Sequence, residues 1–188
     1  MNMKEIIKNI DTQKVMRVIA LNEISRNENV ICKFSFAGGI SGYSFGRSQF
    51  DVKHNEAARN FLKSKCDFTQ AEIDKLLRLD KDIAPLNEKL KAHRKEIDEL
   101  DAEHIKKMIT YVSTLEKLPD MDEKTFVHLV DYHNQFNLSR SGKMHKWLQT
   151  KKYIIPEDIL NFKLNLKWGR EQPQDVKRRY NNIENNWK

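Results

Sequence analysis

The chain has 188 residues, of which 39% are hydrophobic and 32% are charged, a composition that excludes a disordered polymer and fits a folded globular protein. We expect this length to form one domain over residues 1–188 with a core of its own. No stretch approaches the roughly 18–20 apolar residues of a membrane span, and the charged N-terminus lacks the apolar core of a signal peptide. We therefore expect synthesis in the cytoplasm without a cleaved signal.

The net charge of +7 is unevenly distributed. Residues 140–188 contain 12 Lys and Arg against 5 Asp and Glu, whereas the first 139 residues balance to zero. A basic terminal third suits an anionic partner such as a nucleic acid, a cell-wall polymer or a lipid headgroup surface. On charge alone, a solubilising surface is the simpler interpretation.

Asp11 is the predicted N-cap of a helix that runs to about Ile24 and should be largely buried, because its apolar residues recur at helical spacing. Glu23 lies among apolar neighbours near the C-terminal end of this helix. Burying a charged carboxylate is costly, so this position favours a protonated acid. A solvent-facing glutamate on an amphipathic helix is the simpler alternative from this one position.

The next segment predicts the chain's only strands. Residues 31–36 alternate apolar and polar side chains with aromatic content, residues 37–42 form a turn, and residues 43–50 form a second extended segment. Four of the chain's six glycines fall in a window of nine residues, Gly38 to Gly46. Glycine serves where the backbone needs a positive φ or a close approach, so a shaped polar hairpin is expected here.

Helices are predicted from there on. Asn55 caps one helix, and Thr69 with Glu72 forms a capping box that opens the next. The longest helical pattern runs from about residue 86 to 117, with a break near Ala102 as an alternative.

Further along, Asp122 starts a helix after Pro119, Ser141 precedes a short helix, and Pro156 suits the first position of another. Residues 170–188 form either a docked terminal helix or a loose basic tail.

Several kinds of site are disfavoured by their missing motifs. Cys32 and Cys66 have no CxxC spacing, so we expect two reduced thiols rather than a zinc site, with a disulfide as the alternative. The six histidines form no HxxxH or HExxH pattern, and the P-loop, dinucleotide and nucleophile-elbow signatures are absent. Three aromatic residues on one short hairpin are thin support for an RNA-binding sheet, so no nucleic-acid partner is expected.

A pair of carboxylates remains as the candidate for chemistry. Glycoside hydrolysis needs a protonated acid at the leaving oxygen and commonly a second carboxylate. Glu23 at a semi-buried helix end and Asp51 at a polar strand end offer the contrasting surroundings that separate an acid from a base. Their separation along the chain allows both to face one cleft.

The segment Ser44-Phe-Gly-Arg-Ser-Gln-Phe-Asp51 resembles the Gly-Phe-Gly-Leu-Met-Gln-Val-Asp segment that follows the catalytic acid in goose-type lysozymes. With Glu23 in the place of the acid and Ser25 in the place of the serine that often follows it, residues 15–55 resemble the goose-type lysozyme and soluble lytic transglycosylase superfamily. The string is also similar to peptidoglycan hydrolases among phage lysins and secreted antibacterial effectors.

The sequence departs from the family pattern at two points. Goose-type enzymes carry an aspartate just before the Gly-Phe-Gly segment, and residues 36–42 contain no acid. Arg47-Ser48 replaces the usual apolar pair. Whether the reaction ends in hydrolysis or in an intramolecular anhydro product is therefore open.

The resemblance implies a lysozyme-like α+β fold, mostly helical, with one small hairpin or sheet beside the catalytic cleft. It implies cleavage of the β-1,4 bond between N-acetylmuramic acid and N-acetylglucosamine, with Glu23 as general acid and Asp51 assisting, and no cofactor or metal. The residues expected to bind sugar are Tyr43, Ser44, Arg47 and Gln49, and more weakly Tyr132 and Asn134 of a faintly similar groove segment.

The expected partners are peptidoglycan glycan strands, with an immunity or inhibitor protein as a further candidate. The enzyme would act in the periplasm or on the cell wall, after holin-dependent release or dedicated secretion. The alternatives are a lytic transglycosylase and, in another class, a non-enzymatic basic helical module that binds nucleic acid or protein.

Overall fold

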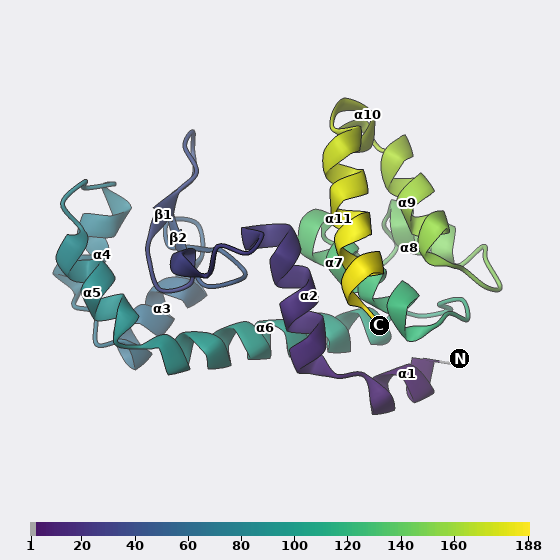
Figure 1. The fold of residues 1–188 in the computed structure, drawn as a ribbon, viewed down its shortest axis with the longest axis horizontal. Coiled ribbons are helices and arrows are strands. Elements are labelled where there is room, and N and C mark those ends of the chain that lie inside the picture. The colour runs from purple at the N-terminus through teal and green to yellow at the C-terminus, as the bar shows by residue number, and fades with distance from the viewer. Residues whose placement is uncertain (1–2) are drawn as a thin grey trace. The chain divides into compact units, whose positions relative to one another are not determined.

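The computed structural model describes residues 3–188, which form many helices and one small antiparallel sheet (Figure 1). This is the mostly helical α+β composition that the sequence predicts. The chain divides into two compact units. One, the terminal unit, comprises residues 1–22 and 104–188, and the other, the central unit, comprises residues 23–103. The expectation of a single domain over residues 1–188 stays a prediction.

The helices are α1 Met3–Asn9, α2 Thr12–Ile24, a 3₁₀ turn η1 Glu28–Val30, α3 Glu56–Lys65, α4 Gln70–Leu77, α5 Ala84–Lys91, α6 Arg94–Ser113, α7 Glu123–Phe136, α8 Lys143–Leu148, α9 Pro156–Asn165, α10 Lys167–Glu171 and α11 Pro173–Asn186. The strands are β1 Ser35–Phe36, β2 Tyr43–Phe45 and β3 Phe50–Asp51. Among residues 3–188, no helix combines the length and the apolar character that crossing a membrane requires.

The sheet of the central unit has three short antiparallel strands in the order β1-β2-β3. Ser35 lies opposite Ser44, and Phe45 lies opposite Phe50. The predicted hairpin with a turn at residues 37–42 is confirmed by the antiparallel pairing of β1 and β2. The predicted extents of its strands were wrong, because residues 31–34 lie outside any strand and residues 43–50 divide into β2, a tight turn and the start of β3. A positive φ at Gly46 and at Gln49 turns the chain between the last two strands.

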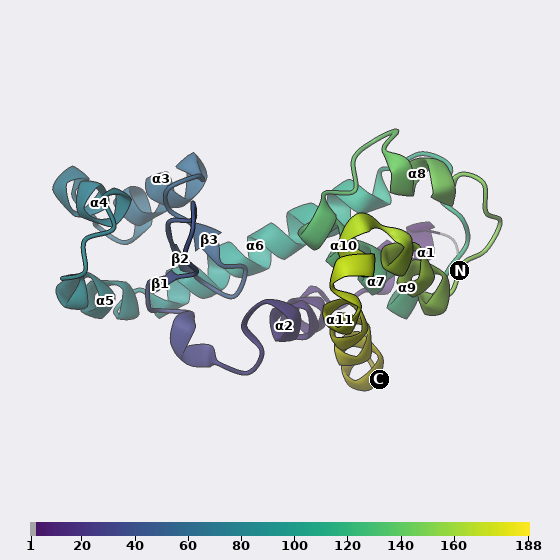
Figure 2. The ribbon, with the colours of Figure 1, turned by 90° about the horizontal axis from the view of Figure 1, so that it is seen from above.

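Aromatic side chains attach this sheet to the helices of the central unit. The Phe45 side chain is fully buried and its ring stacks on Phe61 of α3, with 5.9 Å between centroids. Phe34, just before β1, makes edge contacts with Phe45 and Phe68, also at 5.9 Å. Each such pair contributes about 0.5–1.5 kcal/mol beyond the burial of its area. Figure 2 shows α3 beside the sheet from above.

The predicted helix caps are confirmed. The Asn55 side chain accepts the Ala58 amide at 3.2 Å, and Thr69 and Glu72 cap α4 reciprocally. The Asp122 carboxylate accepts the Thr125 amide at 2.7 Å, and Pro156 opens α9. Local side-chain chemistry therefore determines where these helices begin.

The longest helical pattern is interrupted earlier than expected. α5 ends at Lys91 and α6 begins at Arg94, so the break lies at Ala92–His93, while Ala102 lies inside α6. No proline or glycine marks this turn in the sequence. The helix α1 was also not predicted.

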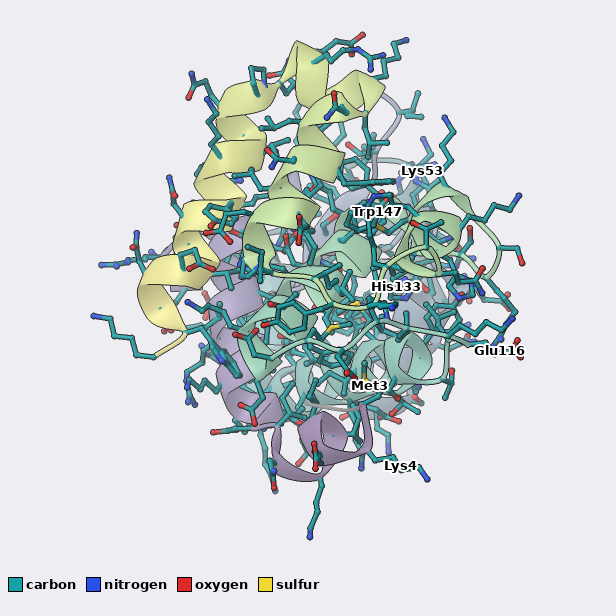
Figure 3. All side chains as sticks on the ribbon, turned by 90° about the vertical axis from the view of Figure 1, so that its right-hand side faces the viewer. Met3, Lys4, Lys53, Glu116, His133 and Trp147 are labelled. Atoms are coloured by element: carbon teal, nitrogen blue, oxygen red, sulfur yellow. The ribbon has the colours of Figure 1, made fainter. Side chains whose placement is uncertain are left out.

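The terminal unit is a group of packed helices. α9 contacts α7, α10 and α11, and α11 also packs on α7 (Figures 1 and 2). Residues 170–188 are thus largely a docked helix, with Val176 and Ile183 fully buried. Charged side chains such as Lys4 and Glu116 extend outward from this unit (Figure 3).

A buried charge cluster joins α2, α7, α9 and α11 within the terminal unit. Asp131 is 2% exposed, and its carboxylate accepts hydrogen bonds from Arg179 at 2.6 Å and from the Asn22 amide at 3.0 Å. The Lys163 ammonium lies 3.6 Å from the same carboxylate. Burial raises the pKa of Asp131, but the positive charges of Arg179 and Lys163 lower it by more, so the net pKa is below its ordinary value.

We expect Arg179→Met to lower the free energy of unfolding by about 3–5 kcal/mol at neutral pH, because it leaves a buried carboxylate poorly compensated. The native pKa of Asp131 lies below its ordinary value of 3.8, so its contribution to stability is present above that pH and is lost as the pH falls through the native pKa. The gap between wild type and variant should therefore narrow on acidification, as measured by guanidinium unfolding across pH.

The matched control is Lys167→Gln, which removes an exposed charge from an i,i+4 pair with Glu171 on α10. It should cost less than about 0.5 kcal/mol at any pH. Equal losses in the two variants would contradict the role assigned to the buried cluster.

Candidate functional site

Glu23 is the penultimate residue of α2 and is half-buried between the buried residues Asn22 and Ile24. The helix it ends is firmly anchored, since Val15, Val18 and Ile19 are at most 4% exposed, as the sequence predicts. Ser25 follows with φ 55°, a left-handed conformation in which the chain leaves the helix. Glu23 is the first residue of the central unit, whereas the buried residues that anchor α2 belong to the terminal unit.

The turn between β2 and β3, residues 46–49, depends on the absence of a side chain at Gly46. Its φ is +77°, and a Cβ at this position would lie 3.1 Å from the Phe50 ring and 3.2 Å from Asp101 Oδ1. The Gly46 amide donates to the Ile31 carbonyl at 2.9 Å, and the Gln49 side chain donates back to the Gly46 carbonyl at 2.9 Å. The glycine thus lets the turn close against its neighbours.

Asp101 of α6 holds this turn through hydrogen bonds to its backbone amides. Its side chain is 0% exposed, and its two oxygens accept the Arg47 amide at 2.8 Å and the Ser48 amide at 3.1 Å. Burial raises the pKa of Asp101 and outweighs the lowering effect of the loop amides and of Arg47. This carboxyl group anchors the turn and was not among the residues predicted from the sequence.

The sequence does contain a signal for this anchor. Ile97, Asp101 and Ile105 follow one another at helical spacing, and both isoleucines are buried. An aspartate on the apolar face of a helix needs partners for its oxygens. Here those partners are two consecutive backbone amides.

Three of the predicted sugar-binding side chains are engaged within the central unit. The Arg47 guanidinium pairs with Asp98 at 2.5 Å and lies 3.4 Å from Asp101. The Tyr43 hydroxyl donates to the Asp80 carbonyl at 2.8 Å, and the Gln49 amide is bonded within its own turn. Ser44 is half-buried on the central strand β2. These contacts shape the loop, and binding of sugar by these residues stays a prediction.

Asp51 is tightly held by its own neighbourhood. One carboxylate oxygen accepts the Gly42 amide at 3.0 Å and lies 3.1 Å from His54 Nδ1, and the other accepts the Lys53 and His54 amides at 2.8 and 3.1 Å. Burial raises the pKa of Asp51, but the hydrogen bonds from Gly42 and His54 lower it more, so the net pKa is below its ordinary value. Asp51 is an ionised carboxylate with most of its acceptor capacity already in use.

Tyr132 and Asn134 belong to α7 of the terminal unit. The Tyr132 side chain is 6% exposed among Phe136 and Phe162, and burial raises its pKa to about 12. Asn134 is half-buried. A tyrosine this deep in a core offers little surface to a glycan, and the role of both residues as groove contacts stays a prediction.

Neither cysteine has the surroundings of a nucleophile. Cys32 and Cys66 are both free, and burial raises the pKa of both, that of Cys66 to about 12. Their thiols are protonated at neutral pH and therefore weakly reactive. Over residues 3–188, no group of three or more His, Cys, Asp or Glu side chains is placed to hold a metal ion.

Comparisons with known proteins find no match for this chain among family models, curated proteins or solved structures. The resemblance to goose-type lysozymes therefore rests on the residues of the segment 15–55 alone.

We expect Asp101→Asn to destabilise the protein by about 2–4 kcal/mol, because an amide side chain must present its NH₂ group to one of the two loop amides. Guanidinium unfolding measures the loss, and hydrogen exchange should show faster exchange at the amides of residues 47 and 48.

Asp98→Asn is the matched control, since Asp98 also pairs with Arg47 but its side chain is 40% exposed. It should cost less than about 1 kcal/mol. Unchanged exchange at the two loop amides in Asp101→Asn would contradict the anchoring role.

Proposed function

We propose that the protein is a peptidoglycan-cleaving glycosidase, a lysozyme-like muramidase acting on the β-1,4 bond between N-acetylmuramic acid and N-acetylglucosamine. The observation that carries this proposal is the setting of Glu23, a half-buried carboxyl group at the end of a helix with a fully packed face. The same compact unit contains the glycine turn and the ionised Asp51. Glycosidic cleavage needs a positioned acid and commonly a second carboxylate, and this unit contains a candidate for each.

In the proposed reaction, Glu23 donates its proton to the glycosidic oxygen as the bond from that oxygen to the anomeric carbon breaks. Positive charge develops on the sugar ring, and the ionised Asp51 stabilises it through space. Water then attacks the anomeric carbon and returns a proton to Glu23. The basic residues 140–188 would hold the enzyme on an anionic wall.

The hydrogen bonds of Asp51 favour a second candidate, a lytic transglycosylase. A carboxylate that already accepts three backbone amides and contacts His54 has little capacity left to orient and deprotonate water. Attack by a hydroxyl group of the muramic acid itself would then replace attack by water and give an anhydro end. This route needs a single acid–base residue, which is Glu23.

A non-enzymatic basic module is the rival from another class. It accounts for the positive charge of residues 140–188 but gives no role to Glu23 or to the glycine turn. Salt-dependent binding to duplex DNA without any action on peptidoglycan would favour this rival.

We expect Glu23→Gln to lower the rate of peptidoglycan solubilisation by about 10²–10⁴-fold, because the amide cannot donate the proton that the leaving oxygen requires. Turbidity loss of purified peptidoglycan measures the rate, and circular dichroism confirms that the variant is folded. Glu99→Gln, which removes an exposed carboxylate paired with Lys95 on α6, is the matched control and should keep the wild-type rate. A folded Glu23→Gln variant with full activity would exclude Glu23 as the acid.

The product ends separate the two enzymatic candidates. Because Asp51 is held by backbone amides, we expect a substantial fraction of the muropeptides to carry anhydro ends, each lighter by one water than the hydrolysis product. Mass spectrometry of a complete digest measures this fraction. Reducing ends alone would contradict the transglycosylase route and leave hydrolysis as the reaction.

A further inference from the structure

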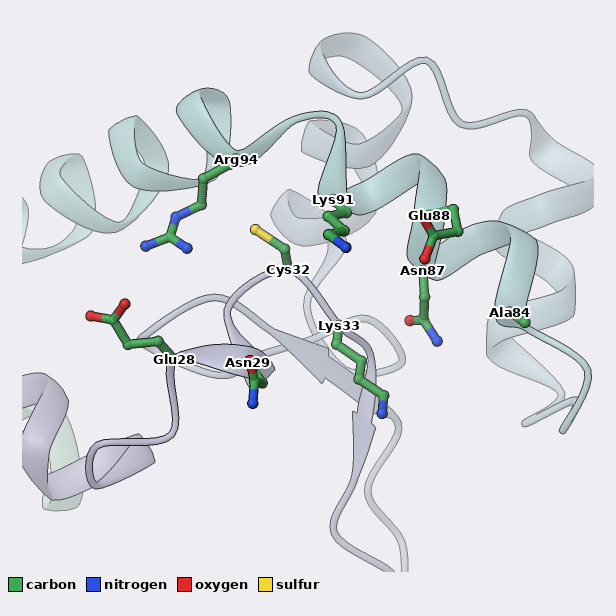
Figure 4. A pocket seen from close by; sticks show the side chains of 9 residues that line it. All are labelled: Glu28, Asn29, Cys32, Lys33, Ala84, Asn87, Glu88, Lys91 and Arg94. Atoms are coloured by element: carbon green, nitrogen blue, oxygen red, sulfur yellow. The ribbon is translucent and has the colours of Figure 1, made fainter.

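The central unit contains a pocket whose lining does not include Glu23 or Asp51, the two residues proposed to be catalytic. It is a cavity of about 650 Å³ between residues 28–33 and the helices α5 and α6. This volume falls within the range of small-molecule sites, roughly 300–1,000 Å³. Figure 4 shows Glu28 and Arg94 at one end, Cys32 and Lys91 in the middle, and Glu88 toward the other end.

Five charged side chains line the pocket, and Arg94 is the one of them with an ion-pair partner among residues 3–188. Within residues 3–188, no acidic group lies within ion-pair distance of Lys33 or Lys91, and no basic group lies within that distance of Glu28 or Glu88. Arg94 is anchored through its Nε, which donates to Asp98 at 2.9 Å, and its guanidinium faces the Glu28 carboxylate (Figure 4). Both signs of charge are therefore presented to a ligand.

The lining identifies the chemistry of that ligand. No aromatic ring lines the pocket, so it lacks the stacking platform that sugars and nucleobases use, and its apolar contribution is limited to groups such as Cys32 and Ala84. The lining contains three basic side chains, Lys33, Lys91 and Arg94, and two acidic ones, Glu28 and Glu88. The complementary molecule carries several carboxylates and fewer amines, which is the charge pattern of an acidic peptide.

We infer that this pocket binds the stem peptide attached to the muramic acid of peptidoglycan. Lys33, Lys91 and Arg94 would bind its free carboxylates, and Glu28 or Glu88 would bind the amine of its diamino acid. The inference rests on the proposed function, because that function supplies a substrate in which an acidic peptide hangs from each cleaved glycan. The enzyme would then bind the peptide as well as the sugar of its substrate.

The test is isothermal titration calorimetry of the full chain with the free tripeptide L-Ala-γ-D-Glu-meso-diaminopimelate. Saturable binding is expected for wild type, weakened about tenfold or more in the Lys33→Gln/Lys91→Gln double variant, which loses two charge-assisted contacts. Both lysine side chains are exposed, so the variant should fold normally. Lys65→Gln, which removes an exposed lysine of α3 outside the pocket, is the matched control and should bind like wild type.

Two results would overturn the inference. One is the absence of tripeptide binding, or binding unaffected by the double variant. The other is equal affinity for the α-linked all-L peptide Ala-Glu-Lys, which would show a pocket without selectivity for the stem. Cleavage of glycan strands stripped of their peptides is measured in parallel. If the wild-type protein cleaves these strands but does not bind the tripeptide, the pocket assignment is refuted and the proposed function stands.

Discussion

The central unit depends on the interaction between the buried Asp101 carboxyl group and two consecutive amides of the turn that follows β2. A carboxyl group with no exposed surface must find hydrogen-bond donors, and the Arg47 and Ser48 amides supply them at 2.8 and 3.1 Å. The turn is thereby fixed to α6. β3 begins two residues later and Asp51 ends it, so the attachment holds the turn that leads into the strand of Asp51.

The same loop shows why its polar residues are difficult to assign to a ligand. Arg47, Tyr43 and Gln49 have side chains typical of sugar binding, yet each makes a hydrogen bond or ion pair inside the unit. Gly42 and Gly46 serve close approach, since a Cβ on Gly42 would lie 2.4 Å from that of Lys53. In a sheet of such short strands, side chains must supply the bonds that a longer ladder would provide. The loop is a scaffold first, and a chemical role for Glu23 stays a proposal.

Features with a local cause were predictable from the sequence. Asn55, Thr69 and Asp122 cap the helices that they were expected to cap, and the apolar spacing of α2 gives its buried face. Features with a distant cause were not. The turn at Gly46 needs Asp101, which lies more than fifty residues away in the chain. The break before Arg94 has no glycine or proline that would indicate it in the sequence. The candidate acid was found from its place on a helix, whereas the saturation of Asp51 by backbone amides is visible only in three dimensions.

The protein combines a half-buried glutamate at a helix end, an ionised second carboxylate with most of its acceptor capacity in use, and a charged pocket. We propose that it breaks a glycosidic bond next to muramic acid. The most direct measurement is digestion of purified peptidoglycan by the wild-type protein, followed by mass analysis of the soluble products. We expect disaccharide-peptides with muramic acid, reducing or anhydro, at the new ends. Absence of soluble products, or release of peptides from intact glycan strands, would contradict the proposed cleavage.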